Sequence, residues 1–111
     1  MALTPPAKSL SDRLSAIMRE SKSRAKGEGL IVSDLQDALK GMTTADMLEL
    51  SPPGTDTGIW TCDQGFCLRL GCRLFGVSPE AVHELPWAQY LLFTQIVSAN
   101  FIRSMEGAIP F

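Results

Sequence analysis

The last third of the chain, residues 78–111, contains the feature that most restricts what the protein can fold into. This stretch carries the longest apolar run, together with one of the two tryptophans, the single tyrosine and three of the five phenylalanines. The segments before it are shorter and more polar. We therefore expect a long apolar helix near the C-terminal end, with the shorter segments folded back onto it.

Two helix starts lie close together in this stretch. Ser78-Pro79-Glu80 is a strong opening, because a serine hydroxyl caps free amides, proline suits the first helical position and an early glutamate suits the helix dipole. Pro86 lacks an amide hydrogen and disfavours helical angles in the residue before it. The sequence thus predicts a short helix over residues 78–84 and a new helix after it.

This second helix is predicted to begin at Pro86 or Trp87 and to end at Glu106, because Gly107 suits the position after a helix. One face follows three- and four-residue spacing and consists of Trp87, Tyr90, Leu91, Thr94, Val97, Phe101 and Met105. Further apolar residues leave only a thin, weakly charged polar face, to which we assign Asn100. Such a helix is either the centre of a small bundle or a helix with two buried faces, one of them against another protein.

A membrane span is not expected from this helix. Its apolar part, from Trp87 to Ile102, is about 16 residues long and includes two glutamines, a serine and an asparagine. The core of a bilayer requires about 20 predominantly apolar residues. The run is therefore too short and too polar to cross a membrane.

Charge is distributed unevenly along the chain. Residues 1–26 carry six basic and two acidic side chains, a net +4, whereas residues 27–111 carry four basic and ten acidic side chains, a net −6. This pattern predicts a flexible basic N-terminal arm on an acidic body, with residues 1–8 and roughly 21–30 flexible. No aromatic residue lies among the basic ones, so the arm cannot stack on nucleic-acid bases.

Two helices are predicted in the first forty or so residues. Ser9 or Ser11 can cap the first, which has apolar residues along one side and basic residues along the other. The second begins at Ser33, which stands at capping-box spacing from Gln36, and Gly41 ends it.

A third, brief helix is predicted from Thr43 or Thr44 to Leu50, and a fourth over residues 63–75 with Asp63 as its cap. Gly71 stands in the middle of the fourth helix, where glycine costs about 1 kcal/mol relative to alanine. Close approach of a neighbouring helix would offset that cost. At 111 residues the chain is predicted to be one all-α domain, a small bundle of about five helices.

Cys62, Cys67 and Cys72 recur every five residues. Sulfurs five residues apart on a helix are rotated by about 140° from one another, so three would not converge on one ion. We therefore predict buried thiols and no metal site. An odd number of cysteines and a start without an apolar export segment predict a cytoplasmic protein with reduced thiols.

No pattern in the sequence predicts catalysis. The chain has no phosphate-binding loop, dinucleotide-binding glycine pattern, zinc-protease motif or nucleophile elbow. His83 is the only histidine, and no flanking pattern supports a nucleophilic pair between it and a cysteine. We predict no catalytic residues, no cofactor and no enzyme activity.

Residues 68–85 have the outline of a helix-turn-helix, with a turn at Gly76 and a serine-capped second helix. The would-be recognition helix, residues 79–84, contains two glutamates and neither arginine nor lysine. DNA binding depends on neutralising phosphates with basic side chains. We therefore expect a helix-turn-helix shape without DNA recognition, and nucleic acid is not the expected partner.

The run Phe75-Gly76-Val77-Ser78-Pro79-Glu80, followed by Leu85-Pro86-Trp87 and a long aromatic helix, resembles the outline of tail assembly chaperones of tailed bacteriophages. The resemblance implies a small helical protein of the host cytoplasm that coats the aggregation-prone helical tape measure protein during virion assembly. It implies no catalytic residues. The positions that it assigns to partner binding are Phe75, Val82, Leu85, Trp87, Tyr90 and Phe93.

The expected function is therefore non-enzymatic protein binding, in which surplus apolar surface engages an apolar helical partner or a second copy of the chain. Three alternatives remain open from the sequence. The chain could be a helix-turn-helix regulator that binds nucleic acid, a structural virion component such as a connector or adaptor, or a small inhibitor of a host protein.

Overall fold

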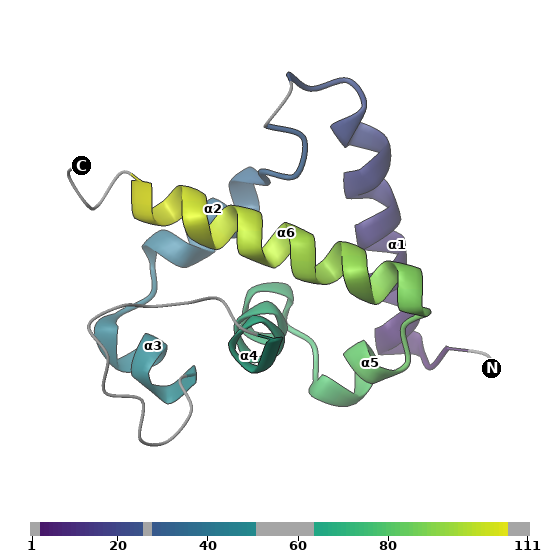
Figure 1. The fold of residues 1–111 in the computed structure, drawn as a ribbon. Coiled ribbons are helices and arrows are strands. Elements are labelled where there is room, and N and C mark those ends of the chain that lie inside the picture. The colour runs from purple at the N-terminus through teal and green to yellow at the C-terminus, as the bar shows by residue number, and fades with distance from the viewer. Residues whose placement is uncertain (1–2, 26–27, 51–63, 107–111) are drawn as a thin grey trace.

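The computed structural model of the chain describes residues 3–25, 28–50 and 64–106. Within these residues the chain forms six helices and no strand (Figure 1). The helices are α1 (Pro5–Ser21), α2 (Ser33–Lys40), α3 (Thr44–Leu50), α4 (Gln64–Phe75), α5 (Pro79–His83) and α6 (Trp87–Glu106). The expected all-helical bundle with a long C-terminal helix is confirmed.

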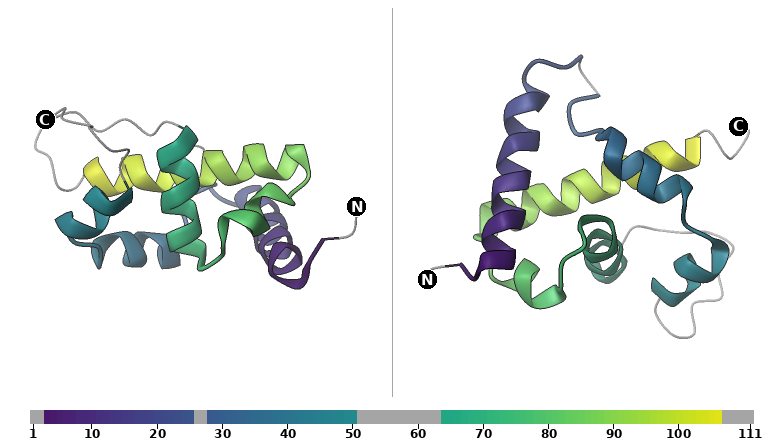
Figure 2. Two further views of the ribbon diagram at one scale, coloured as in Figure 1. Left: turned by 90° about the horizontal axis from the view of Figure 1, so that it is seen from below. Right: turned by 180° about the vertical axis from the view of Figure 1, so that it is seen from behind.

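The long helix α6 is the element on which the others assemble. It packs against α4, α2 and α1. In Figure 1 it crosses in front of α2 and α1, and α4 lies below it. In the left view of Figure 2, α6 lies on one side of the molecule and is crossed by α4, and in the right view it runs behind the other helices. α1 lies near its N-terminal half and α2 near its C-terminal half (Figure 2). No helix among the described residues is both long enough and apolar enough to cross a membrane.

The core is a single cluster of buried apolar side chains from five of the six helices. Phe66 of α4 meets Phe101 of α6 edge to face, with ring centroids 5.1 Å apart. The cluster also includes Leu10, Leu14, Leu35, Leu39, Leu70, Val82, Phe93, Ile96 and Val97. The remaining helix, α3, contributes only partly buried residues at its edge.

The first helix begins earlier than the sequence predicts. It starts at Pro5, directly after Thr4, rather than at Ser9 or Ser11. Prolines in the first turn lose no hydrogen bond, because the first amides of a helix have no partner within it. Ala7 of this first turn is already fully buried.

The basic N-terminal segment therefore lies against the body of the protein instead of extending as an arm. Leu10 and Leu14 of α1 belong to the core cluster, and α1 contacts both α5 and α6. This packing corrects the expectation of an arm for residues 3–21. The expected flexibility of residues 21–30 stays a prediction.

The bounds predicted for α2 are confirmed, but the predicted capping box is wrong. Val32 occupies the capping position before α2, and no side chain caps the start of the helix. Gln36 instead turns toward α6 and donates to Asn100. The side-chain amide of Gln36 therefore makes a tertiary contact with α6 and does not cap its own helix.

Local capping does set the start of α3. The amide of Asp46 donates to Oγ1 of Thr43 over 3.2 Å, and the amide of Thr43 donates to the Asp46 carboxylate over 2.9 Å. These two bonds satisfy the free amides at the helix start. Hydrogen bonding from the Thr43 amide and from the Thr43 side chain lowers the pKa of Asp46, with a smaller contribution from the charge of Arg73.

The turn from α4 through α5 to α6 follows the sequence signals closely. Gly76 adopts a positive φ of 70°, and the Val77 amide donates back to the Cys72 carbonyl, which together end α4. The Ser78 hydroxyl accepts from the Ala81 amide at the start of α5. The predicted short helix and the predicted start of the long helix are confirmed, whereas Asp63, the predicted cap of α4, lies outside the described residues.

Candidate protein-interaction site on the long helix

The outward side of α6 carries three large exposed apolar side chains. Trp87 is 68% exposed, Leu91 is 42% exposed and Ile102 is 50% exposed. Their separations of four and eleven residues place them on one side of a helix with 3.6 residues per turn. Gln95, also exposed, continues the same line between Leu91 and Ile102. We refer to Trp87, Leu91, Gln95 and Ile102 together as the α6 stripe.

The α6 stripe is uncharged along its whole length. No residue from Trp87 to Ile102 carries an ionisable acid or base other than the phenol of Tyr90. Solvent-facing helix sides of soluble proteins are ordinarily rich in charged residues. An uncharged, partly apolar line on the surface is a feature of sites that bind another protein.

Charges appear only where the stripe ends. Arg103 donates from Nη1 to Glu28 over 2.9 Å and also forms an ion pair with Glu106. The hydrogen bond from Arg103 lowers the pKa of Glu28, and the same contact raises the pKa of Arg103. A cation thus lies at the C-terminal end of the α6 stripe, held against the segment that precedes α2.

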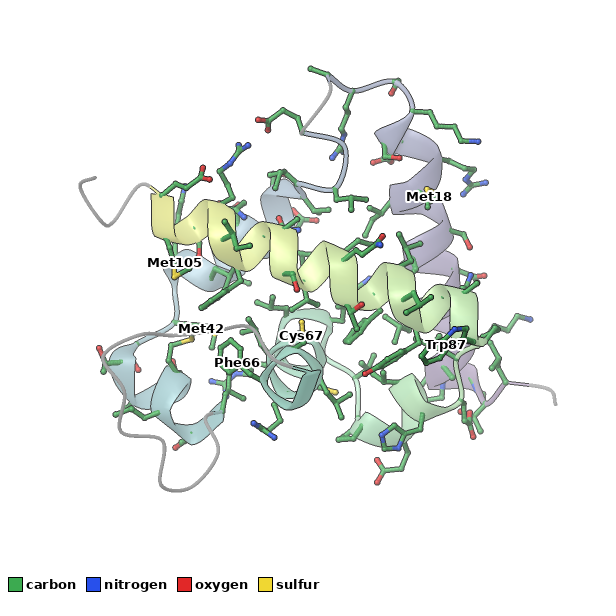
Figure 3. The ribbon with its side chains drawn as sticks, viewed as in Figure 1. Met18, Met42, Phe66, Cys67, Trp87 and Met105 are labelled. Carbon is green, nitrogen blue, oxygen red and sulfur yellow. The ribbon has the colours of Figure 1, made fainter. Side chains whose placement is uncertain are left out.

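A row of stacked rings connects Trp87 to the core. The Trp87 and Tyr90 rings lie 5.8 Å apart with an interplanar angle of 24°, and the Tyr90 and Phe93 rings lie 6.3 Å apart with an angle of 22°. Phe93 in turn lies 5.7 Å from Phe75 of α4. Figure 3 shows Trp87 at the N-terminal end of α6. The Trp87 indole is therefore packed against other rings before a partner binds. This packing reduces the conformational entropy that the Trp87 side chain would lose on binding.

The row of rings ends on a cation from α1. The guanidinium carbon of Arg13 lies 4.7 Å from the centroid of the Phe75 ring. Arg13 also donates to the Phe75 carbonyl over 2.7 Å, at the C-terminal end of α4. The aromatic row that supports Trp87 is thereby tied to three helices, α1, α4 and α6.

The six positions that the sequence resemblance assigns to partner binding are divided between the core and the surface. Phe75, Val82, Leu85 and Phe93 are buried. Tyr90 is half-buried and Trp87 is exposed. Of these six, a partner of the folded chain can reach only Trp87 and the edge of Tyr90. Phe93 and Phe75 support them through the row of rings.

Leu91 and Ile102 are the contact candidates that the resemblance does not include. Leu91 appears in the predicted aligned face of the helix, but that face is in part turned inward, because Val97 and Phe101 are buried. Counting in steps of four from Trp87 through uncharged residues would have found Leu91 and Gln95. No local signal distinguishes the exposed Ile102 from its buried neighbours.

Asn100 belongs to the inner side of α6, which corrects its assignment to a polar face. It is fully buried. Its Oδ1 accepts from the Val32 amide and from Gln36 Nε2, each over 3.0 Å. Its Nδ2 donates to the carbonyls of Leu30 and Ile96, each over 2.8 Å. Asn100 thereby joins the start of α2 to α6 with every polar atom of its side chain paired.

Cys67, Cys72 and His83, which lie in the described part of the chain, do not form a second site. Cys67 is buried near the hydroxyl of Ser98, with 3.2 Å between Sγ and Oγ. Cys72 is half-buried, and burial, with a smaller contribution from the charge of Glu80, raises the pKa of its thiol. Within residues 3–25, 28–50 and 64–106, no three His, Cys, Asp or Glu side chains gather closely enough to hold a metal ion. Cys62 lies outside these ranges, and His83 is exposed.

The second helix of the helix-turn-helix outline, α5, contains neither arginine nor lysine. The five-residue α5 buries Ala81 and Val82 against the core. It exposes Pro79, Glu80 and His83. This short helix therefore serves to position the start of α6.

Comparison of the chain with protein-family models, with curated proteins and with solved structures gave no match. The likeness to tail assembly chaperones is thus an expectation from the sequence pattern alone. Function is inferred below from the geometry of the α6 stripe.

Proposed function

We propose that the protein is a non-enzymatic binding protein that shields an apolar helical segment of another protein along the α6 stripe. The observation that carries this proposal is the exposed indole of Trp87, held by stacked rings at the end of an uncharged helix side. Tryptophan is among the residues that most often dominate the energy of a protein interface.

The stripe has enough apolar surface to matter for affinity. A tryptophan offers at most about 250 Å² for burial, so the exposed part of Trp87 amounts to roughly 170 Å². At about 25 cal/mol per Å², covering it contributes about 4 kcal/mol before the costs of association. Leu91 and Ile102 add to this, and Gln95 supplies hydrogen-bonding groups between them.

A helix is the natural shape for the partner. Ridges formed by residues four apart, such as Trp87, Leu91 and Gln95, pack between the side chains of a second helix. Because the stripe is uncharged, a partner helix with charges on the contacting face would lose hydration without compensation. The partner is therefore an apolar or amphipathic helix whose contacting face is uncharged.

Within this class of function, the resemblance to tail assembly chaperones names one specific role. A tape measure protein is a long apolar helical client, and a small helical protein that covers it keeps it soluble during virion assembly. We propose this role for the chain, with the host cytoplasm as its site of action. The α6 stripe would be the surface that covers the client.

Nucleic-acid binding is less well supported by the arrangement of charges. Arg13 is engaged with the Phe75 carbonyl and ring, and Arg24 with the carboxylate of Glu20 and nearby carbonyls. α5 exposes Glu80 and no basic side chain other than His83. These contacts hold the guanidinium groups of Arg13 and Arg24 against the protein, away from phosphates.

The proposal is tested by binding of a defined helical probe. The probe is a synthetic amphipathic peptide with an uncharged leucine and alanine face, and its affinity is measured by isothermal titration calorimetry. Trp87→Ser is expected to raise the dissociation constant by a factor of about ten or more. The matched control is Leu48→Ser, because Leu48 of α3 is 59% exposed and lies outside the stripe.

Circular dichroism verifies that both variants keep their helical content. Equal binding by the wild type and the two variants would show that the probe does not use the α6 stripe, and absence of binding by the wild type would remove the proposal. Co-expression with a bacteriophage tape measure protein tests the specific role. The wild type should keep the client soluble and Trp87→Ser should not.

A further inference from the structure

We infer that, in the absence of a client, the α6 stripe is covered by a second copy of this chain in an antiparallel two-fold dimer. This inference rests on the proposed function, since both assign the stripe to binding an uncharged helix side. It adds the identity of the resting partner, which is the stripe itself.

The order of residues along the stripe suits pairing with itself. A two-fold interface uses the same surface on both copies, so residues at one end must fit those at the other. The stripe is apolar at both ends, with Trp87 and Ile102, and polar near its midpoint, with Gln95. Antiparallel pairing brings Trp87 of each copy toward the partner's Ile102. It also brings the two Gln95 amides together near the axis, where each can donate to the other.

Charge selects the antiparallel orientation. Arg103, which is paired with Glu28 and Glu106 of its own chain, lies just beyond the C-terminal end of the stripe. The Glu84 carboxylate, which accepts from Thr4, lies just before Trp87 at the other end. Antiparallel pairing brings each Arg103 toward the indole and carboxylate of the opposite copy, where a cation is favoured by both. Parallel pairing would instead place the two Arg103 side chains together. Antiparallel helices also bring opposite ends of their dipoles together.

The position and size of the stripe set the strength of the dimer. In the left view of Figure 2, α6 lies on one side of the molecule, where α4 crosses it. Sixteen residues of helix span about 24 Å, and one such helix side offers less than the ~800 Å² per partner of a typical stable interface. We therefore expect a weak dimer, with a dissociation constant on the order of 10 μM. A contact of that strength can be displaced by a client that binds more tightly.

The test places a charge at the expected two-fold axis. Sedimentation velocity of the full chain is measured over about 1 μM to 1 mM, a range that brackets the expected dissociation constant. The wild type is expected to pass from monomer to dimer over this range. Gln95→Glu and Gln95→Arg should each weaken the dimer by a factor of ten or more, because like charges meet at the axis.

A mixture of the two variants provides the decisive measurement. Gln95→Glu and Gln95→Arg pair opposite charges across the axis, so their equimolar mixture should recover the dimer that neither forms alone. Asp37→Lys, an exposed change on α2, is the control and should leave the wild-type dimer intact. Failure of the mixture to dimerise, or a dimer indifferent to either Gln95 variant, would overturn the inference.

The helical probe peptide separates this inference from the proposed function. A wild type that stays monomeric at all concentrations yet binds the peptide through Trp87 overturns the dimer and leaves the proposed function standing. A dimer that the Gln95 variants weaken as expected, but that does not bind the peptide, overturns the proposed function and leaves the dimer standing. If both are correct, adding the peptide should convert the dimer into a one-to-one complex.

Discussion

The ring of Phe93 on α6 fills the space that a side chain at Gly71 on α4 would need. A Cβ placed on Gly71 would lie 2.2 Å from Cζ of Phe93, far inside van der Waals contact. The two helices can therefore approach this closely only because residue 71 has no side chain. Phe93 also stacks on Tyr90, which stacks on Trp87, so this contact in the core fixes the position of the exposed indole.

Gly71→Ala is expected to destabilise the protein, although alanine favours helices. Overpacking against Phe93 costs about 1–3 kcal/mol, whereas the gain in helix propensity is about 1 kcal/mol. The smallest cost in this range would cancel the gain, and larger costs would exceed it. We expect a net loss of about 1 kcal/mol in the free energy of unfolding, measured with urea. Gly41→Ala is the control, because its Cβ would meet only ordinary contacts at 3.6 Å.

A second substitution shows whether the Gly71 effect comes from the ring. Phe93→Leu in the Gly71→Ala background should cost less than Phe93→Leu alone, because the smaller side chain relieves the overlap. Strict additivity of the two changes would contradict the direct contact between these residues.

Asn100→Leu is expected to lower the free energy of unfolding by about 2–4 kcal/mol. Leucine has a similar volume, but it leaves the Val32 amide and the Gln36 side chain without their acceptor in a buried place. Urea unfolding gives the size of the loss. Amide hydrogen exchange should show faster exchange at Val32. Gln95→Leu on the exposed side of the same helix should change stability by less than about 0.5 kcal/mol.

Stability should decrease in acid partly through Glu84. The hydroxyl and the amide of Thr4 donate to its carboxylate over 2.6 and 3.0 Å, and these bonds lower the pKa of Glu84 from its ordinary value of 4.5. A lowered pKa in the folded state stabilises the protein above the unfolded pKa, and this contribution is lost as the pH falls through the folded pKa. Glu84→Gln should therefore show a smaller fall in Tm than the wild type on acidification below 4.5.

Two controls accompany the acid measurement. Thr4→Val removes the hydroxyl and keeps the backbone amide, so its pH dependence should lie between those of the wild type and Glu84→Gln. Glu28 and Asp46, whose pKa values are also lowered, contribute to the acid sensitivity that remains in every variant. An identical pH profile for Glu84→Gln and the wild type would show that the Thr4 contact does not contribute.

Arg13→Lys should destabilise the junction of α1 and α4. Lysine keeps the charge but cannot both donate to the Phe75 carbonyl and lie flat over the Phe75 ring, as Arg13 does. We expect a loss of about 0.5–1.5 kcal/mol, measured by thermal unfolding. Arg19→Lys, an exposed basic change near the end of the same helix, should stay within about 0.5 kcal/mol of the wild type.

Helix boundaries that depend on a few neighbouring residues were predictable from the sequence. Ser78 caps α5, Pro86 separates α5 from α6, and Gly76 adopts the positive φ that ends α4. The requirement for close packing at Gly71 was also predictable, because a glycine inside a helix is costly without a compensating contact. Each of these features follows from backbone chemistry within one or two turns.

Predictions that required knowledge of the surroundings were less successful. Gln36 stands at capping-box spacing, yet its amide binds Asn100, 64 residues away in the sequence. α1 was expected to extend as an arm, but it packs into the core through Leu10 and Leu14. The candidate contact residues were divided between core and surface for the same reason, since an apolar side chain suits either a core or an interface.

The sequence by itself determined the helical class, the bounds of α2 and α6, and the lack of charge along α6, because these depend on local backbone preferences and on composition. Only the tertiary structure decided which side of α6 faces solvent. A helix that is apolar nearly all round has no preferred inward direction, so the crossing at Gly71 and the buried bonds of Asn100 fix its rotation. That rotation leaves Trp87, Leu91 and Ile102 outside.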